Sequence, residues 1–185
     1  MIRHEFIATR QDCLLLVIDF QAALLKVMQN RKEVTRTVNQ LAGAAQVFDI
    51  PILLTEQYPK GLGPTTPEVM ENIGSPLVFQ KDHFSACMEP DFLQTVDSYG
   101  RGKIVIVGVE THVCVLQTSM DLIRAGYQVH VASDAVASRT AENRSIALDL
   151  LRDAGAVITS TEIVIFQWAL RANTEDFRRI LPIVK

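Results

Sequence analysis

Three side chains in this sequence of 185 residues could together perform nucleophilic chemistry: Cys114, Asp19 and Lys81. A cysteine nucleophile needs a group that accepts its proton and a positive neighbour that favours the thiolate, and a carboxylate and an ammonium supply both. Each residue also has an ordinary structural explanation. Cys114 could pack in the core, Asp19 could cap a helix, and Lys81 could be a solvated surface residue. The elements that position these side chains decide between the two interpretations.

Cys114 lies in a segment, residues 100–125, that has the pattern of a strand, a tight turn and a helix. The apolar run 103–107 is typical of a strand, Gly108 interrupts it, and a helical pattern resumes from about His112. Cys114 then falls in the first helical turn, where unpaired N–H groups and the helix dipole favour negative charge. We therefore expect its thiol pKa to be lowered.

Strand-length apolar runs recur along the chain, and helical patterns separate most of them. The runs are 13–18, 51–55, 77–80, 103–107, 127–132 and 156–159, and the helical patterns are 33–48, 89–99, 112–125, 141–154 and 160–170. This alternation predicts a Rossmann-like, three-layer α/β/α fold with a six-stranded parallel sheet. Ile146, Leu150 and Leu151 are predicted to face that sheet, residues 55–63 and 133–139 to form loops, and residues 174–181 to add a last helical turn or two.

The three candidate residues follow strands whose carboxyl ends meet at one edge of the predicted sheet, where open α/β sheets bind ligands. Asp19 follows the first strand, Lys81 the third and Cys114 the fourth. With the strand order 3-2-1-4-5-6, Lys81 starts about 10 Å from Asp19, which a long side chain on an inward-turning loop can span. In this scheme Asp19 accepts the proton of Cys114, and Lys81 stabilises the resulting negative charge.

The composition argues against nucleic-acid and membrane-surface binding, because 18 basic and 21 acidic residues give a net charge of −3 and no basic run exceeds a pair. Cys13, Cys87 and Cys114 have neither the even number of a disulfide framework nor the spacing of a zinc site. Residues 1–5 contain no apolar signal core. We expect one domain over residues 1–185 in the cytoplasm. No cofactor is expected, because the usual dinucleotide and phosphate-binding glycine motifs are missing.

Four segments in order along the chain give the sequence a specific resemblance. They are 16–21 (LVIDFQ), 80–86 (QKDHFSA), 108–115 (GVETHVCV) and 133–139 (SDAVASR). Together they resemble the isochorismatase-like cysteine hydrolase superfamily, which includes isochorismatases, nicotinamidases and N-carbamoylsarcosine amidase-like enzymes. The loop 55–63 (TEQYPKGLG) further resembles the isochorismatase-domain-containing branch, whose substrates are mostly unassigned.

The resemblance implies roles for particular residues. Asp19, Lys81 and Cys114 would form the catalytic triad on a sheet of order 3-2-1-4-5-6. A non-proline cis peptide at Val109–Glu110 would turn the Glu110 N–H towards the Cys114 N–H, forming an oxyanion hole. The family also implies a homo-oligomer that acts on a small molecule.

The resemblance leaves the substrate open but argues against a metal. Metal-binding nicotinamidases carry an Asp-x-His type cluster after the second strand, whereas residues 55–58 here read TEQY and the four histidines are scattered. The main hypothesis is a hydrolase of a small amide or carbamoyl-type C–N substrate. Isochorismate hydrolysis and a non-catalytic, oligomeric or partner-binding role are the alternatives. The candidate pocket residues are Phe20, Gln21, Tyr58, Phe84, His112 and Trp168, with His83 a further possibility.

Overall fold

The computed structural model describes residues 4–185. The prediction that residues 1–5 contain no signal core therefore lies partly outside the described residues, because it includes residues 1–3. The predicted fold is confirmed: six parallel strands form one sheet in the order β3-β2-β1-β4-β5-β6. The strands are β1 (Cys13–Ile18), β2 (Ile52–Gln57), β3 (Leu77–Lys81), β4 (Lys103–Val109), β5 (Gln128–Ala137) and β6 (Val157–Thr159).

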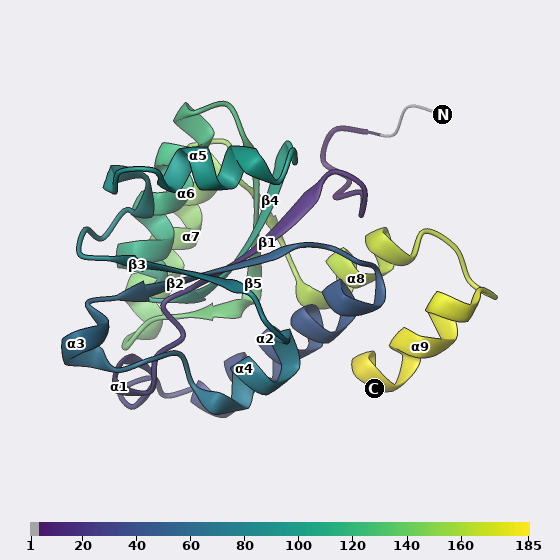
Figure 1. The fold of residues 1–185 in the computed structure, drawn as a ribbon, viewed down its shortest axis with the longest axis horizontal. Helices are drawn as coiled ribbons and strands as arrows, with labels where there is room; N and C mark the ends of the chain where they lie inside the picture. The colour runs from purple at the N-terminus through teal and green to yellow at the C-terminus, as the bar shows by residue number, and fades with distance from the viewer. Residues whose placement is uncertain (1–3) are drawn as a thin grey trace.

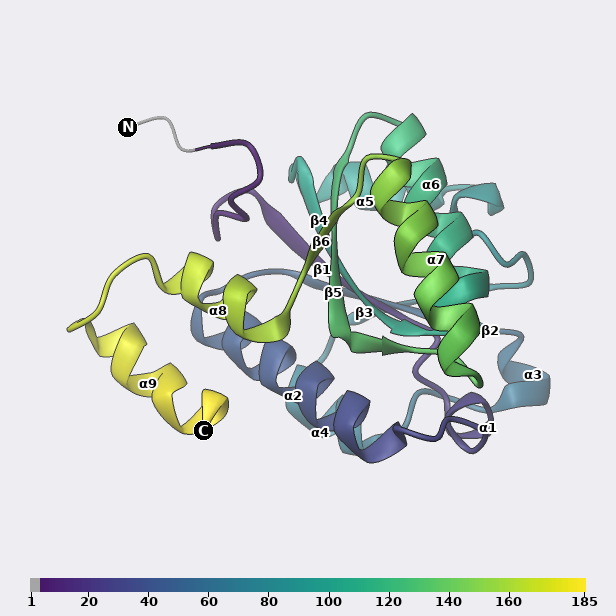
Figure 2. The same ribbon diagram turned by 180° about the vertical axis from the view of Figure 1, so that it is seen from behind.

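Helices cover both faces of the sheet (Figure 1). On one face lie α2 (Arg31–Val47), α4 (Pro67–Ile73) and α8 (Thr161–Ala169), with α9 (Glu175–Val184) packed against α2; on the other lie α5 (Phe92–Ser98), α6 (Leu116–Arg124) and α7 (Ala141–Asp153). Figure 2 shows the same two layers from behind. The short helices α1 (Ala22–Leu25) and α3 (Pro59–Leu62) lie at the carboxyl edge of the sheet.

The central strand β1 divides the core into two clusters because its side chains alternate between the two faces. Leu14, Leu16 and Ile18 pack into the cluster beneath α5, α6 and α7, whereas Cys13, Leu15 and Val17 pack towards α2. All six are fully buried, as expected for a strand covered on both faces. This rigid centre holds the carboxyl ends of β1 and β4 side by side.

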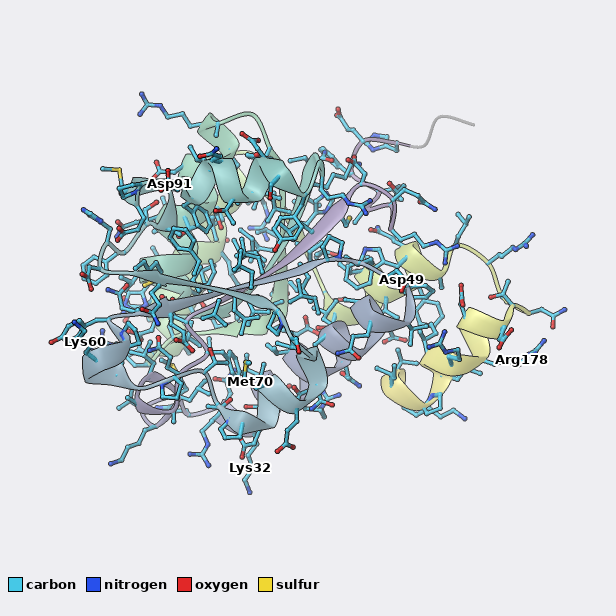
Figure 3. The ribbon with its side chains drawn as sticks, viewed as in Figure 1. Lys32, Asp49, Lys60, Met70, Asp91 and Arg178 are labelled. Atoms are coloured by element: carbon cyan, nitrogen blue, oxygen red, sulfur yellow. The ribbon has the colours of Figure 1, made fainter. Side chains whose placement is uncertain are left out.

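The two ends of the sheet are clearly separated in the molecule. Figure 3 shows Lys60 projecting from α3 at the carboxyl end and Arg178 projecting from α9 at the opposite side.

Among residues 4–185, no helix is both long and apolar enough to span a membrane.

Three local predictions were wrong. Residues 133–137 were predicted as loop, but they continue β5, because a register irregularity opposite Ile106–Gly108 lets the strand resume pairing with β4. Ile146 and Leu150 were predicted to face the sheet but are 51% and 45% exposed. Leu151 is buried as predicted, together with Ala147 and Leu148. Because each step along a helix turns the side chain by about 100°, this buried stripe points away from Ile146 and Leu150. The predicted loop 55–63 contains the end of β2 and helix α3.

The end of β4 is tightly packed against β1. Gly108 has a φ of 125°, and a Cβ at this position would lie 2.1 Å from the carbonyl oxygen of Ile18. The following peptide bond, Val109–Glu110, is cis. Any side chain at residue 108 would therefore separate the two strands that carry Asp19 and Cys114.

Candidate active site

An ion pair between Lys81 and Asp19 forms the centre of the candidate site. Lys81 Nζ lies 2.7 Å from Asp19 Oδ2, and both side chains are fully buried. Removing two charges from water is costly, so such a pair is stable only where further polar contacts satisfy its remaining donors and acceptors. The surrounding residues supply those contacts.

Strand register explains how Lys81 reaches Asp19 across β2. Ile18 pairs with Thr55, while Lys81 pairs with Gln57, two residues further along β2. Lys81 therefore lies beyond the end of β1, and its long side chain returns over β2 to the carboxylate. The Lys81 side chain in this way covers the distance of two strands that the predicted strand order places between Lys81 and Asp19.

The two oxygens of Asp19 have different environments. Oδ1 accepts a hydrogen bond of 2.7 Å from the Thr55 hydroxyl. Oδ2 makes the ion pair with Lys81, but among the described residues it receives no well-aligned hydrogen bond. Oδ2 is therefore the oxygen with capacity to accept a proton.

Cys114 is almost fully buried, in the turn Thr111–Val115 that precedes α6. Its pKa is raised to about 12, first by burial and then by the charge of Asp19, while the ammonium of Lys81 lowers it. The sequence predicted a lowered pKa from the helix terminus, and that prediction was wrong because burial and the nearby carboxylate outweigh that influence. The Cys114 thiol lies beside a carboxylate, and the raised pKa favours its neutral form near pH 7.

Gln57 links these groups, and the sequence analysis did not single it out. Its Oε1 lies 2.6 Å from Lys81 Nζ and 3.9 Å from Cys114 Sγ. Gln21 fixes the backbone of Gln57 from both sides, accepting from its N–H at 2.8 Å and donating to its carbonyl at 2.9 Å. Gln21, predicted as a pocket residue, is thus a buried support for Gln57. Only the strand register, which the sequence does not reveal, brings Gln57 to this position.

A second ion pair lies after β4, on the Cys114 side of Asp19. Both carboxylate oxygens of Glu110 bind Arg139, at 2.9 Å to Nη2 and 3.1 Å to Nε, and Oε2 also accepts from the Arg139 N–H at 3.0 Å. Next to this pair, His112 Nδ1 lies 3.0 Å from the Ser138 hydroxyl. Residues 138–139, the end of one of the four motif segments, thus orient the residues that flank Cys114.

The aromatic pocket candidates divide into two groups. Tyr58 and Phe84 are more than half exposed and lie directly beside Lys81, since the Tyr58 N–H donates to the Lys81 carbonyl and the Phe84 carbonyl lies 3.4 Å from Lys81 Nζ. Phe20 and Trp168 are fully buried in the cluster on the α2 side of the sheet, whereas Cys114 belongs to the other cluster. Core packing accounts for Phe20 and Trp168, and a role for either in the pocket stays a prediction.

The histidines of the described chain do not gather around the ion pair. His83 Nδ1 lies 2.8 Å from Glu89 Oε1 at the surface, and His130 is buried within β5. Within residues 4–185, no three His, Cys, Asp or Glu side chains come together as a metal site would require. The absence of a metal remains a prediction.

The six-stranded parallel sheet with helices on both faces defines a three-layer α/β/α protein, and comparison with known proteins identifies the family. The isochorismatase domain model matches residues 13–163. This chain belongs to the isochorismatase family.

Relatives cover nearly the whole chain. The secreted isochorismatase effector Isc1 of Phytophthora sojae is 39% identical over 92% of this chain and 83% of its own length. The structure of MAR1 ribonuclease from Caenorhabditis elegans is 34% identical with a TM-score of 0.89, covering 96% of this chain and 91% of that one.

Two YcaC structures show the same fold. The protein from Pseudomonas aeruginosa, solved with hexane-2,5-diol and covalent acrylamide, is 26% identical over 98% of this chain and 93% of its own, with a TM-score of 0.90. YcaC from Escherichia coli, an octameric hydrolase of unknown specificity, is 24% identical over 98% and 94% of the two chains, with a TM-score of 0.89. Family membership supports a hydrolase.

Proposed function

We propose that this protein hydrolyses the C–N bond of a small amide or carbamoyl-type substrate through a covalent intermediate on Cys114. The observation that carries the proposal is the fully buried Asp19–Lys81 ion pair, with Gln57 Oε1 in contact with both Lys81 Nζ and Cys114 Sγ. A structural ion pair would not need a thiol in contact with its hydrogen-bond network. A cysteine hydrolase needs this grouping.

The first half of the reaction forms the covalent intermediate. Asp19 Oδ2 takes the proton of Cys114 as Sγ attacks the carbonyl carbon, so the thiolate forms only as the bond forms. Lys81 keeps the ammonium beside this charge, and the N–H groups of Glu110 and Cys114 donate to the carbonyl oxygen as it becomes negative. Asp19 then returns the proton to the leaving nitrogen, and ammonia or an amine departs.

The second half releases the product and restores the resting state. Water attacks the thioester or related acyl group while Asp19 accepts a proton from it, and the C–S bond breaks. The sulfur regains its proton from Asp19. A raised thiol pKa suits this cycle because the sulfur then stays neutral at rest and ionises only as it attacks a molecule bound beside Asp19.

The test is ammonia release from a panel of small amides and ureas. The wild-type protein is expected to turn over at least one of them, and Cys114→Ala is expected to lose more than about 10³-fold of that rate. Cys87→Ala, which removes a half-buried thiol outside the triad, serves as the matched control and should retain activity.

Covalent capture separates this proposal from the non-catalytic alternative. Acrylamide, the molecule held covalently in the YcaC structure, is small and carries an amide. Peptide mass spectrometry should find its adduct on Cys114 before it appears on Cys13 or Cys87. If the protein releases no ammonia and Cys114 forms no adduct ahead of Cys13 and Cys87, the hydrolase proposal is contradicted. The non-catalytic binding or oligomeric role is then favoured.

We also infer that the chain forms a homo-oligomer. The exposed Ile146 and Leu150 on α7 support this inference because large apolar side chains one helical turn apart form a surface suited to a second copy. Light scattering after size-exclusion chromatography measures the assembly directly. A monomer at micromolar concentration would contradict the inference.

A further inference from the structure

The ammonium of Lys81 is surrounded by oxygens from three parts of the chain. Besides Asp19 and Gln57, the carbonyl oxygens of His83 and Phe84 lie 3.2 and 3.4 Å from Nζ. Two of its four oxygen neighbours therefore belong to the segment that immediately follows Lys81. The conformation of residues 82–84 sets where the ammonium can lie.

One carboxylate oxygen holds that segment in place. Glu89 Oε1 accepts hydrogen bonds from the backbone N–H groups of Asp82 and His83, at 2.7 and 2.8 Å, and lies 2.8 Å from His83 Nδ1. Successive backbone N–H groups that converge on one anion form a nest. These hydrogen bonds, from the His83 N–H first, lower the pKa of Glu89 to about 2, so the carboxylate stays charged throughout the neutral range.

The other end of the segment is tied to the helix that follows Cys114. The Ser85 hydroxyl donates to Asp121 Oδ2 at 2.6 Å, and the Ala86 N–H donates to the Thr118 hydroxyl at 3.1 Å. Both acceptors are on α6. With its later residues fixed to α6, the segment has its earlier residues fixed by Glu89 and by the Gln57 side chain, whose Nε2 donates to the Asp82 carbonyl at 2.7 Å. Glu89 holds the N–H groups, and Gln57 holds one carbonyl.

We propose that Glu89 is a positioning residue for Lys81: by binding the N–H groups of Asp82 and His83, it turns the carbonyls of His83 and Phe84 onto Nζ and keeps the ammonium against Asp19 and Cys114. The proposal rests on the function proposed for Lys81. It assigns a role to a surface carboxylate that the triad alone does not require. Without Glu89, the segment loses three contacts, and two of the four oxygens around Lys81 Nζ lose that support.

Reductive methylation with formaldehyde and a borane reductant tests the position of Lys81 directly, without any substrate. In the wild-type protein Lys81 is expected to resist methylation, while the exposed Lys60 reacts. Glu89→Ala should raise the methylation rate of Lys81 at least about tenfold and leave Lys60 unchanged, because it removes the acceptor of all three contacts. Glu71→Ala, at an exposed glutamate on α4, is the matched control and should change neither rate.

Two further variants keep the test decisive. His83→Leu retains both backbone donors and removes only the ring contact, so we expect a rise of less than about threefold. Glu89→Gln retains one acceptor oxygen without the charge and should fall between His83→Leu and Glu89→Ala. Protection of the core thiol Cys13 from a maleimide reports that each variant is folded, and Glu89→Gln replaces Glu89→Ala if the alanine variant loses that protection.

The outcomes separate this proposal from the proposed function. A Lys81 methylation rate unchanged in folded Glu89→Ala, or in Glu89→Gln where it replaces the alanine variant, overturns the positioning role and leaves the triad untouched. A raised Lys81 rate together with a roughly tenfold slower addition of acrylamide to Cys114 supports both. A raised Lys81 rate with unchanged Cys114 addition supports the role of Glu89 and counts against Lys81 in the proposed chemistry.

Discussion

Cys13 and Cys114 are both buried thiols in contact with the same sheet, yet only one lies beside a group that can take its proton. Cys13 begins β1 at the amino edge, and Cys114 follows β4 at the carboxyl edge. Burial raises the pKa of both, to about 11 for Cys13 and about 12 for Cys114. Ionisation alone therefore does not single out Cys114 as the more reactive sulfur.

Cys13 and Cys114 differ in the charged and polar groups that lie beside each thiol. Cys13 lies next to the indole of Trp168 in the core; after burial, which raises its pKa, Trp168 lowers that pKa and the charge of Asp12 raises it. Cys114 has the buried carboxylate of Asp19 and the ammonium of Lys81 beside it. The feature that favours Cys114 over Cys13 as the proposed nucleophile is a neighbouring charged proton acceptor, and the proposed reaction requires no low resting pKa.

The largest expected effect comes from neutralising one carboxylate at each end of β1. Asp19→Asn should reduce turnover by about 10²–10⁴-fold, because an amide cannot accept the proton of Cys114. Asp12→Asn, beside Cys13, should leave turnover within about twofold, since Asp12 holds only the Gly102 N–H at the opposite edge. Initial rates of ammonia release measure both. Equal losses in the two variants would remove the distinction between the edges.

Glycine substitutions at the two ends of β4 should differ in stability. Gly108→Ala is expected to destabilise the fold by about 3 kcal/mol or more, because its Cβ would meet the Ile18 backbone at a φ of 125°. Gly100→Ala, before β4, has a φ of 62° but nothing within 4 Å, so it should cost only about 1 kcal/mol. Urea unfolding gives both values. A similar cost for the two would show that the carboxyl edge is not specially constrained.

His130 shows that burial without a counter-charge suppresses ionisation, as it does for Cys13. Its pKa is lowered to about 4, first by burial and then by Lys103. Between about pH 6.5 and 4 the unfolded chain binds more protons than the folded one, so stability must decrease as the pH falls through this window. We expect the free energy of unfolding to drop by about 2 kcal/mol between pH 7 and pH 5 from this group.

His130→Leu isolates that contribution. The variant should lose the part of the pH dependence that His130 supplies, and urea unfolding at pH 7 and pH 5 measures the change. An identical pH dependence in wild type and variant would show that His130 ionises freely in the folded protein.

The sequence predicted the sheet and the edge at which Asp19, Lys81 and Cys114 meet, because continuous apolar runs mark buried parallel strands and their ends. The strand order was implied by the resemblance to the isochorismatase-like hydrolases. The sequence did not predict the contacts of Gln57 or Glu89. Gln57 reaches Cys114 only through the β2–β3 register, and Glu89 acts through the backbone conformation of a loop. Hydrophobic periodicity carries information on neither.

Hydrophobic periodicity also fails to reveal the structure of residues 133–137 and the buried face of α7, which were predicted wrongly. The polar residues Ser133 and Asp134 suggested a loop, but β5 continues past them through an irregularity that lets Asp134 cap α8 at Thr161. The stripe Ile146–Leu150 is as apolar as the one that α7 buries. Only packing between the helices decides which stripe faces inward.

The most direct test of the account is the pH dependence of acrylamide addition to Cys114 in Asp19→Asn. Asp19 raises the pKa of this thiol and Lys81 lowers it, so removing the carboxylate should move the reaction profile of Cys114 down by about one to two pH units even though hydrolysis is lost. Peptide mass spectrometry across the pH range, with Asp12→Asn as the control, measures the shift. A profile that stays in place or moves upward would contradict the claim that Asp19 governs the proton of Cys114.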